Sequence, residues 1–163
     1  MCIAACGASW SWRATPPRRP RSSNIEDAPV TGPEDLFHAA LAARKSAYAP
    51  FSDFAVGVAL RTESGRIFTG ANIENQSFPE GWCAETTAIS HMIMAAKTDD
   101  DRIIKEVVVA GELSTPLTPC GGCRQRLAEF GRPDTVVHSA NAEGIRASWT
   151  LAELLPAGFA MDG

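Results

Sequence analysis

Residues 103–123 read IIKEVVVAGELSTPLTPCGGC, and this stretch decides the fold class because it sets a buried strand, a loop and a helix start in succession. Three consecutive valines at 107–109 are typical of a strand that is covered on both faces. Two prolines then mark a loop. A helical pattern follows from Cys123 to Phe130. The stretch therefore predicts a central strand of a sheet and a helix that packs on that sheet.

The segments on either side extend this pattern of helices and strands. Spacing and alternation predict helices from Thr31 to Tyr48, at 83–97 and from Thr150 with its capping-box partner Glu153, and strands at 54–60, 66–69, 135–139 and 145–149. The expected order is helix, two strands, helix, strand, helix, strand, strand, helix. Strands that alternate with helices predict a mixed sheet with helices on its faces, which is an α/β fold.

Composition places the chain among globular proteins with a single domain. Of its 163 residues, 45% are hydrophobic and 21% are charged. The longest apolar run, around residues 107–110, is far too short to cross a bilayer. We therefore expect one folded domain and no membrane segment.

The net charge of −4 hides an uneven distribution along the chain. Residues 1–23 contain four arginines and no acidic residue, so the remainder carries 11 basic against 19 acidic side chains, a balance near −8. Proteins hold nucleic-acid backbones mainly through lysine and arginine. An acidic body without a basic stripe argues against a nucleic-acid polymer as substrate and favours a small neutral ligand.

Five cysteines cannot all pair within one chain, because the number is odd. Cys2 and Cys6 lie in a stretch rich in proline and arginine, whose composition predicts a disordered basic tail over residues 1–30. The folded domain is expected at residues 31–163. The other three cysteines lie among residues that favour metal chemistry over bridging, which indicates a reducing compartment, the cytoplasm.

Two short motifs carry the chemistry, Cys83-Ala84-Glu85 and Pro119-Cys120-Gly121-Gly122-Cys123. Three thiols match a catalytic zinc site, which leaves one coordination position for water, whereas a structural site usually has four protein ligands. Both motifs fall at predicted helix starts, where unpaired N–H groups stabilise thiolates. We therefore predict Zn²⁺ on Cys83, Cys120 and Cys123, with Glu85 free to transfer protons as the catalytic group.

Less specific interpretations of these residues stay open at this point. A cysteine of the tail could complete a closed structural zinc site. Cys120 and Cys123 could form a redox pair, although that pair leaves Cys83 and Glu85 without a role. A zinc-binding module without activity would have no need of Glu85.

Five segments between Glu34 and Phe159 resemble, in the same order, the small homotetrameric cytidine deaminases. They are PFSDFAVG at 50–57, GANIEN at 70–75, CAE at 83–85, PCGGCRQ at 119–125 and LLP at 154–156. The resemblance implies a cytidine-deaminase-like three-layer fold, in which helices cover both faces of a mixed five-stranded sheet. It also implies a homotetramer.

The resemblance further implies which residues hold a nucleoside. Phe54 would stack on the pyrimidine, and the backbone around Ala84 would read the edge of the base. Asn72 and Glu74 would hold the ribose hydroxyls. These residue types suit the task, because an aromatic face matches a flat base and an amide with a carboxylate matches a hydroxyl.

Phe78 and Phe159 match family positions that complete the pocket of a neighbouring subunit, so a monomer would be inactive. Judged by their own pattern alone, these two residues and Phe54 have ordinary core residues as their alternative interpretation.

Together these residues predict hydrolytic deamination of cytidine and deoxycytidine to uridine and deoxyuridine, a reaction of pyrimidine salvage. A deaminase of a modified or antibiotic nucleoside is the alternative within the same superfamily. An enzyme that edits polynucleotides would need aromatic and basic groups along a groove, and this acidic chain supplies few.

Two positions depart from the family pattern. Thr86 follows Glu85 where the family often has an arginine that can donate to the zinc thiolates, so the charge of the metal site is expected to be less compensated. Trp82 stands directly before the first ligand and is expected to alter the wall of the pocket.

Overall fold

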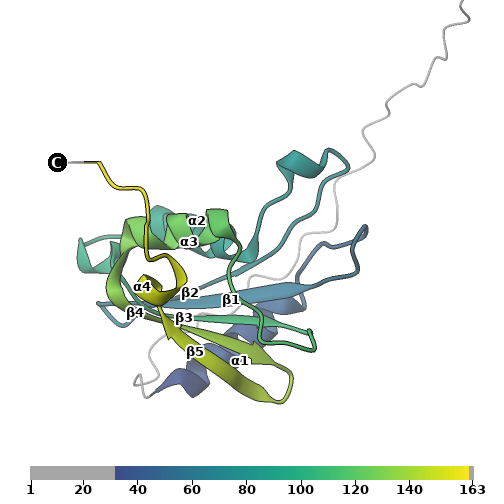
Figure 1. The fold of residues 1–163 in the computed structure, drawn as a ribbon, viewed down its shortest axis with the longest axis horizontal. Helices are drawn as coiled ribbons and strands as arrows, with labels where there is room; N and C mark the ends of the chain where they lie inside the picture. The colour runs from purple at the N-terminus through teal and green to yellow at the C-terminus, as the bar shows by residue number, and fades with distance from the viewer. Residues whose placement is uncertain (1–31, 162–163) are drawn as a thin grey trace, which may run out of the picture.

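The structure is a computed structural model that describes residues 32–161 (Figure 1). The helices are α1 (Pro33–Arg44), α2 (Ala84–Ala95), α3 (Gly121–Phe130) and α4 (Leu151–Leu154), with short 3₁₀ turns η1 (Phe78–Glu80) and η2 (Asp100–Arg102). The strands are β1 (Val56–Thr62), β2 (Ile67–Ala71), β3 (Ile104–Gly111), β4 (Gly131–Asn141) and β5 (Gly144–Thr150). In this part of the chain, every helix is too short or too polar to cross a bilayer. The tail predicted at residues 1–30 lies outside the described residues.

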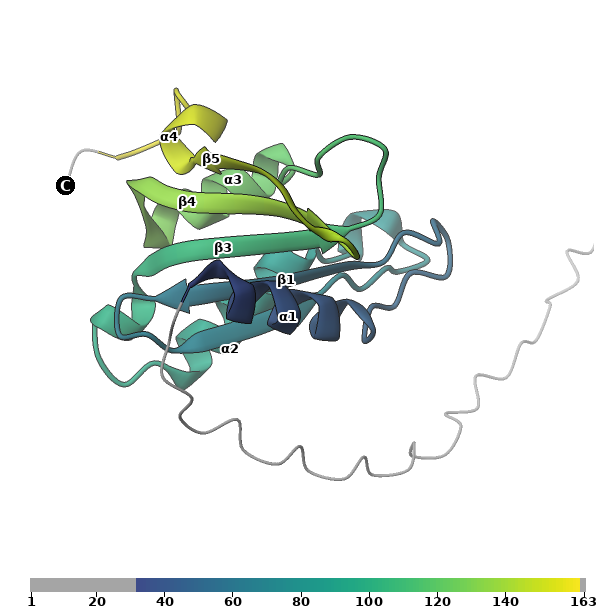
Figure 2. The same cartoon turned by 90° about the horizontal axis from the view of Figure 1, so that it is seen from below.

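One five-stranded sheet runs through the molecule in the order β2-β1-β3-β4-β5 (Figure 2). β1 pairs antiparallel with both β2 and β3, β4 pairs antiparallel with β5, and β3 and β4 are parallel. Parallel neighbours need a crossover connection, which the segment with α3 supplies. The predicted mixed sheet and α/β class are confirmed, and the strand with three valines is the central one.

Helices cover both faces of this sheet. α1 lies on one face, and α2 and α3 lie on the other (Figures 1 and 2). Val107 and Val109 of β3 join the core on the side of α2 and α3, whereas Val108 joins the core on the side of α1. Successive strand residues point to opposite faces, so one run of valines packs against both helix layers.

Two glycines let the helices approach the sheet closely. A Cβ added to Gly57 would overlap the backbone of α1, and one added to Gly70 would overlap the backbone of α2 at Ala84 and Ala88. Any side chain at Gly70 would therefore push the first turn of α2 away from β2. Because Cys83 directly precedes that turn, Gly70 fixes how close this predicted ligand lies to the sheet.

The predicted order of elements is confirmed, but the first helix is shorter than expected. It ends at Arg44 rather than near Tyr48. The amide of Tyr48 donates to the carbonyl of Asn72 at 3.0 Å, and the amide of Glu74 donates to the carbonyl of Tyr48 at 2.7 Å. Tyr48 thus pairs with the segment after β2, and this competing pairing ends the helix.

The strand predicted at 135–139 is longer than expected, because β4 runs from Gly131 to Asn141. Other element ends agree more closely with the sequence. The helix expected from Cys123 begins two residues earlier, at Gly121, because Cys120 already caps it. The capping box of Thr150 and Glu153 is present at α4. The N-cap of the first helix is Gly32 rather than the expected Thr31, which lies outside the described residues.

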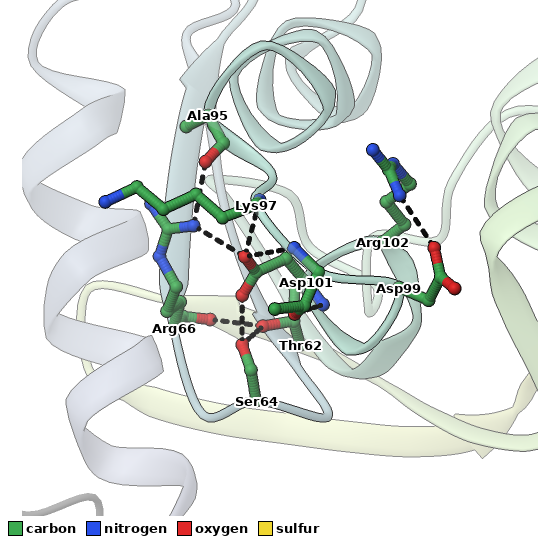
Figure 3. Close-up of polar contacts among 9 residues, drawn as sticks. Thr62, Ser64, Arg66, Ala95, Lys97, Asp99, Asp101 and Arg102 are labelled. Atoms are coloured by element: carbon green, nitrogen blue, oxygen red, sulfur yellow. Dashed lines mark hydrogen bonds and ion pairs between the residues drawn. The ribbon is translucent and has the colours of Figure 1, made fainter.

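Buried Asp101 ties the hairpin of β1 and β2 to the end of α2 (Figure 3). Its carboxylate accepts hydrogen bonds from the Ser64 hydroxyl at 2.6 Å, the Lys97 amide at 2.8 Å, the Arg66 guanidinium at 3.0 Å and the Thr98 amide at 3.2 Å. These donors, chiefly Ser64 and the Lys97 amide, hold the pKa of Asp101 well below its usual range. The network anchors α2 at the end remote from Cys83.

We expect Asp101→Asn to lower the midpoint of thermal unfolding at neutral pH. A carboxyl whose pKa is lowered by folding stabilises the native state above its ordinary pKa of about 4, and the stabilisation is lost as the pH falls through and below that value. The gap between the unfolding midpoints of the two proteins should therefore stay constant from neutral pH to about pH 5 and begin to narrow only below about pH 4. A gap that does not narrow below about pH 4 would contradict the role of the charge. Asp99→Asn, at an exposed pair with Arg102, is the control and should change little.

Candidate metal centre and active site

Two helices of the structure begin with a cysteine at the N-cap. Cys83 caps α2 and Cys120 caps α3, each with an extended backbone, and neither side chain accepts a hydrogen bond from its own helix. Serine, threonine, aspartate or asparagine usually occupies this position and pairs with the free N–H groups of the first turn. With cysteine there, these N–H groups and both helix dipoles are available to stabilise thiolates.

The three cysteines lie together in a group that fits zinc. The Sγ atoms of Cys83, Cys120 and Cys123 lie within 4.8 Å of one another, and those of Cys83 and Cys120 are 3.8 Å apart. Tetrahedral zinc with Zn–S bonds of about 2.3 Å holds its sulfur ligands about 3.8 Å apart. All three are free thiols, and thiolates select zinc over magnesium or calcium. The donor set therefore suits zinc with one position left open.

Contacts within this group favour the ionised form of one sulfur. The neighbouring thiol of Cys123 is the main cause that lowers the pKa of Cys83 to about 6. The same contact, together with burial, raises the pKa of Cys123. The group therefore favours a thiolate at Cys83, the form that binds a metal cation.

Glu85 lies beside the cysteines in the first turn of α2, outside the group of ligands. Its side chain is only 4% exposed, and burial raises the pKa of its carboxyl. The neighbouring thiol of Cys123 partly offsets this rise. The preceding residue, Ala84, is buried as well. Its methyl side chain has no polar group, so only its backbone can form hydrogen bonds with a substrate. From this place a carboxyl can take up and release protons next to the metal centre.

Arg124 holds the loop that leads to Cys120. Its guanidinium donates to the carbonyl of Pro119 at 2.8 Å, to the carbonyl of Leu154 at 2.9 Å and to the hydroxyl of Thr118 at 3.0 Å. These bonds join the loop to α3 and α4. Arg124 therefore shapes the cysteine loop through the backbone on either side of it.

Arg126 is a residue that sequence reasoning missed. A Cβ added to Gly122 would lie 3.0 Å from Nη1 of Arg126, so the guanidinium folds back over the first turn of α3. Its charge adds to the hydrogen bond from Cys123 in lowering the pKa of Cys83, and it partly opposes the rise that burial causes at Glu85. Helical spacing was the available signal, because residues four apart share one face of a helix.

A pocket of about 340 Å³ lies next to the segment that joins β2 to α2. It is lined by Phe51, Ser52, Glu74, Asn75, Phe78 and Gly81. The rings of Phe51 and Phe78 pack edge to face with their centroids 5.8 Å apart. Two of the predicted substrate residues, Glu74 and Phe78, thus share one pocket. Trp82, which was expected in a pocket wall, does not line this one.

Asn72 directly follows β2 and holds the entry to β1. Its side-chain carbonyl accepts from the Val56 amide at 2.8 Å, and its side-chain amide donates to the carbonyl of Phe54 at 2.9 Å. The first turn of α2 lies alongside, because the Thr87 hydroxyl donates to the carbonyl of Ala71 at 3.1 Å. Phe54 and Asn72 are therefore neighbours of the helix start that carries the first cysteine.

Glu74 holds the turn that precedes Phe54. Its carboxylate accepts from the Phe51 amide at 2.8 Å, from the Ser52 amide at 3.2 Å and from the Ser52 hydroxyl. The bond from the Ser52 hydroxyl is the main cause that lowers the pKa of Glu74. A carboxylate has about four acceptor sites, so Glu74 keeps one for a ligand.

Phe159 lies apart from the other predicted substrate residues. Its backbone exchanges hydrogen bonds of 2.9 and 3.0 Å with the side chain of Gln125 on α3. Phe159 is 74% exposed, and Phe78 is 75% exposed. The segment after α4 and the segment between β2 and α2 extend on opposite sides of the molecule (Figure 1). Within the described residues of one chain, the two rings therefore do not share a pocket.

Comparison with known proteins identifies the family. The family model for the cytidine and deoxycytidylate deaminase zinc-binding region matches residues 31–139. A cytidine deaminase of Sporosarcina psychrophila is 39% identical over 129 residues, which are 79% of this chain and 92% of that protein. A cytidine deaminase of Halalkalibacterium halodurans is 39% identical over 127 residues, which are 78% of this chain and 93% of that protein.

Solved structures agree with these sequence matches. The crystal structure of cytidine deaminase from Burkholderia pseudomallei is similar with a TM-score of 0.72 and 39% identity, and the match covers 79% of this chain and 100% of that one. The cytidine-deaminase-like three-layer fold expected from the sequence is confirmed. The chain belongs to the cytidine and deoxycytidylate deaminase family and carries the zinc-binding region of that family.

Proposed function

We propose that this protein is a zinc-dependent hydrolase that deaminates cytidine and deoxycytidine to uridine and deoxyuridine, as a step of pyrimidine salvage. The observation that carries the proposal is the buried carboxyl of Glu85 beside three clustered thiols. Three protein ligands leave a coordination position for water, as a catalytic zinc site requires. Similarity to cytidine deaminases over most of the chain favours cytidine as the substrate.

The reaction exchanges the amino group on C4 of the base for the oxygen of water. Zinc, when bound by the three cysteines, would supply a Lewis acid that lowers the pKa of a water molecule. Glu85 accepts one proton from the attacking water and passes it to N3 of the base. It then moves the second proton to the amino group, which leaves as ammonia, and the C4 carbonyl of the product remains.

The side chains around the entry to β1 suit a nucleoside. Phe54 offers an aromatic face to the base, and the backbone of Ala84 offers hydrogen-bonding groups to its edge. Asn72 and Glu74 each keep hydrogen-bonding capacity for a ribose hydroxyl. Both are already fixed by backbone partners, so binding would order them at small entropic cost.

The substrate is a small molecule in this proposal, and the compartment is the cytoplasm. The acidic balance of the chain disfavours a nucleic-acid polymer. Within residues 32–161 the three cysteine thiols are unbridged, a state that a reducing compartment preserves. We assign the catalytic domain to residues 31–163 and residues 1–30 to an appended tail, and the family match begins at residue 31.

Ultraviolet absorbance of the purified protein with cytidine, deoxycytidine, cytosine and a short oligonucleotide tests the reaction and the substrate class. We expect turnover of the two nucleosides alone.

Glu85→Gln should keep its zinc and lower kcat by about 10²- to 10⁴-fold, the usual contribution of a positioned acid-base group. The control is Glu129→Gln, an exposed acid on α3. Near-normal turnover by Glu85→Gln would remove this residue from the mechanism, and turnover of the oligonucleotide alone would overturn the substrate class.

We also propose a homotetramer whose pockets are shared between subunits. Exposed apolar side chains gather around the segment before α2, where Ile73 and Trp82 exchange backbone hydrogen bonds of 2.9 and 2.8 Å and Phe51 packs on Phe78. Contiguous exposed apolar patches mark protein interfaces. Phe78 and Phe159, both three-quarters exposed, would gain cover by entering the pockets of neighbouring chains.

Mixing two inactive variants tests the shared pocket. Glu85→Gln and Phe159→Ala chains are dissociated together and reassembled at equal amounts. If Phe159 acts on a neighbouring chain, about one pocket in four contains both intact groups, since each contributing chain is of the required kind half the time. The mixture should then exceed the activity of both parents. No gain from mixing, or a scattering mass of one 17.4 kDa chain, would contradict the proposal.

A further inference from the structure

The turn that leads into β1 contains a backbone conformation that is uncommon for a residue with a side chain. Asp53 has a φ of 56°, in the left-handed region, and within residues 32–161 it is the only residue other than glycine with a positive φ. Such a conformation persists where the surrounding structure imposes it. Asp53 directly precedes Phe54, the ring proposed to stack on the base. The contacts that fix this turn therefore also set the position of Phe54.

The hydroxyl of Ser52 connects this turn to the carboxylate of Glu74. Its oxygen accepts a hydrogen bond from the Phe54 amide at 3.1 Å, and its proton is donated to Oε1 of Glu74. An amide N–H can only donate and a carboxylate can only accept, so the direction of both bonds is fixed. One oxygen atom thus bridges the backbone of Phe54 and the side chain of Glu74.

The other carboxylate oxygen of Glu74 binds the backbone at the start of the turn. Oε2 accepts from the Phe51 amide at 2.8 Å and from the Ser52 amide at 3.2 Å. Both acceptor sites of Oε2 are then used, whereas Oε1 binds the Ser52 hydroxyl and keeps one site. Oε1 is therefore the oxygen available to a sugar hydroxyl, and it is the one that Ser52 holds.

Ser52 contributes several hydrogen bonds at once, and the turn needs them together. The residue is exposed, and Ser52 and Glu74 both line the pocket of about 340 Å³. A single hydrogen bond adds only a modest net free energy, because it replaces a bond to water. Ser52 takes part in three, through its amide, its hydroxyl proton and its hydroxyl oxygen. Loss of the hydroxyl would remove two of these and leave the Phe54 amide without this acceptor.

We propose that Ser52 is a positioning residue that couples sugar recognition to base stacking, because one hydroxyl holds both the Glu74 carboxylate and the backbone of Phe54. The inference rests on the proposed function, which gives Glu74 a sugar hydroxyl and Phe54 a base to bind. With the hydroxyl in place, the two groups have a fixed spacing before a nucleoside arrives. Groups that are ordered in advance lower the entropic cost of binding.

The first measurement needs no substrate. Hydrogen exchange of the Phe54 amide is followed by nuclear magnetic resonance in the full-length protein. Ser52→Ala removes the acceptor of this amide, so we expect its exchange to accelerate by about 3- to 10-fold, the range for loss of one hydrogen bond. Ser52→Thr keeps a hydroxyl and should retain the protection. Ser46→Ala, in the exposed turn after α1, is the control and should match the unmodified protein.

The second measurement is the steady-state kinetics with cytidine. Ser52→Ala weakens contacts that hold substrate and transition state alike, so we expect KM to rise by about 3- to 10-fold with kcat nearly unchanged. Ser52→Thr should restore KM. When Glu74 is already replaced by alanine, the further change from Ser52→Ala should be smaller, since residues of one hydrogen-bonded network are not additive.

The dependence of KM on pH adds a readout that a purely structural role would not change. The Ser52 hydroxyl is the main cause that lowers the pKa of Glu74. Without it the pKa of this carboxyl rises, so the carboxylate is lost at a higher pH as the solution is acidified. We therefore expect the KM of Ser52→Ala to begin its rise at a higher pH than the KM of the unmodified protein.

The outcomes separate this inference from the proposed function. Unmodified protein that turns over cytidine, together with Ser52→Ala of unchanged KM and unchanged exchange at Phe54, would overturn the coupling and leave the deaminase proposal standing. Equal effects in the Ala and Thr variants would also overturn it, because the hydroxyl would then not be what matters. Failure of the unmodified protein to turn over cytidine would overturn the proposed function itself, and the coupling with it.

Discussion

The meeting of two helix N-termini is the constraint on which the rest of this molecule depends. Each of α2 and α3 has cysteine where a capping oxygen would usually stand, and the two sulfurs lie 3.8 Å apart. The free N–H groups of both first turns therefore converge on one point, and negative charge is stabilised there. The buried thiol of Cys123, three residues after Cys120, joins the same group, and the buried carboxyl of Glu85 follows Cys83 by two residues in the first turn of α2.

The sheet and the loops bring these helix ends together. Gly70 lets α2 lie directly on β2, and the central strand β3 leads into the loop that Arg124 holds at the start of α3. At the other end of α2, Asp101 binds backbone amides and the β-hairpin. A metal site needs ligands held to within a fraction of an ångström, and these contacts fix both helices at the positions that carry sulfur.

Local signals in the sequence were sufficient for the order of the elements and for the cysteine group. The run of valines in β3, the capping box at Thr150 and the cysteine spacing each depend on neighbours within a few residues. Arg126 was missed because its place over the first turn of α3 depends on how one long side chain folds. The separation of Phe78 from Phe159 was likewise not predictable, since it arises from packing between segments distant in the chain.

We propose that the three cysteines alone provide the protein ligands of a zinc ion with one open position. X-ray absorption at the zinc edge of the purified full-length protein tests this ligand set, because the technique counts the sulfur atoms bound to the metal. We expect three sulfur ligands at about 2.3 Å and one oxygen or nitrogen ligand. Four sulfur ligands would indicate a closed structural site, and two or fewer would mean that the cysteine group is not the zinc site; either result would overturn the proposed metal centre.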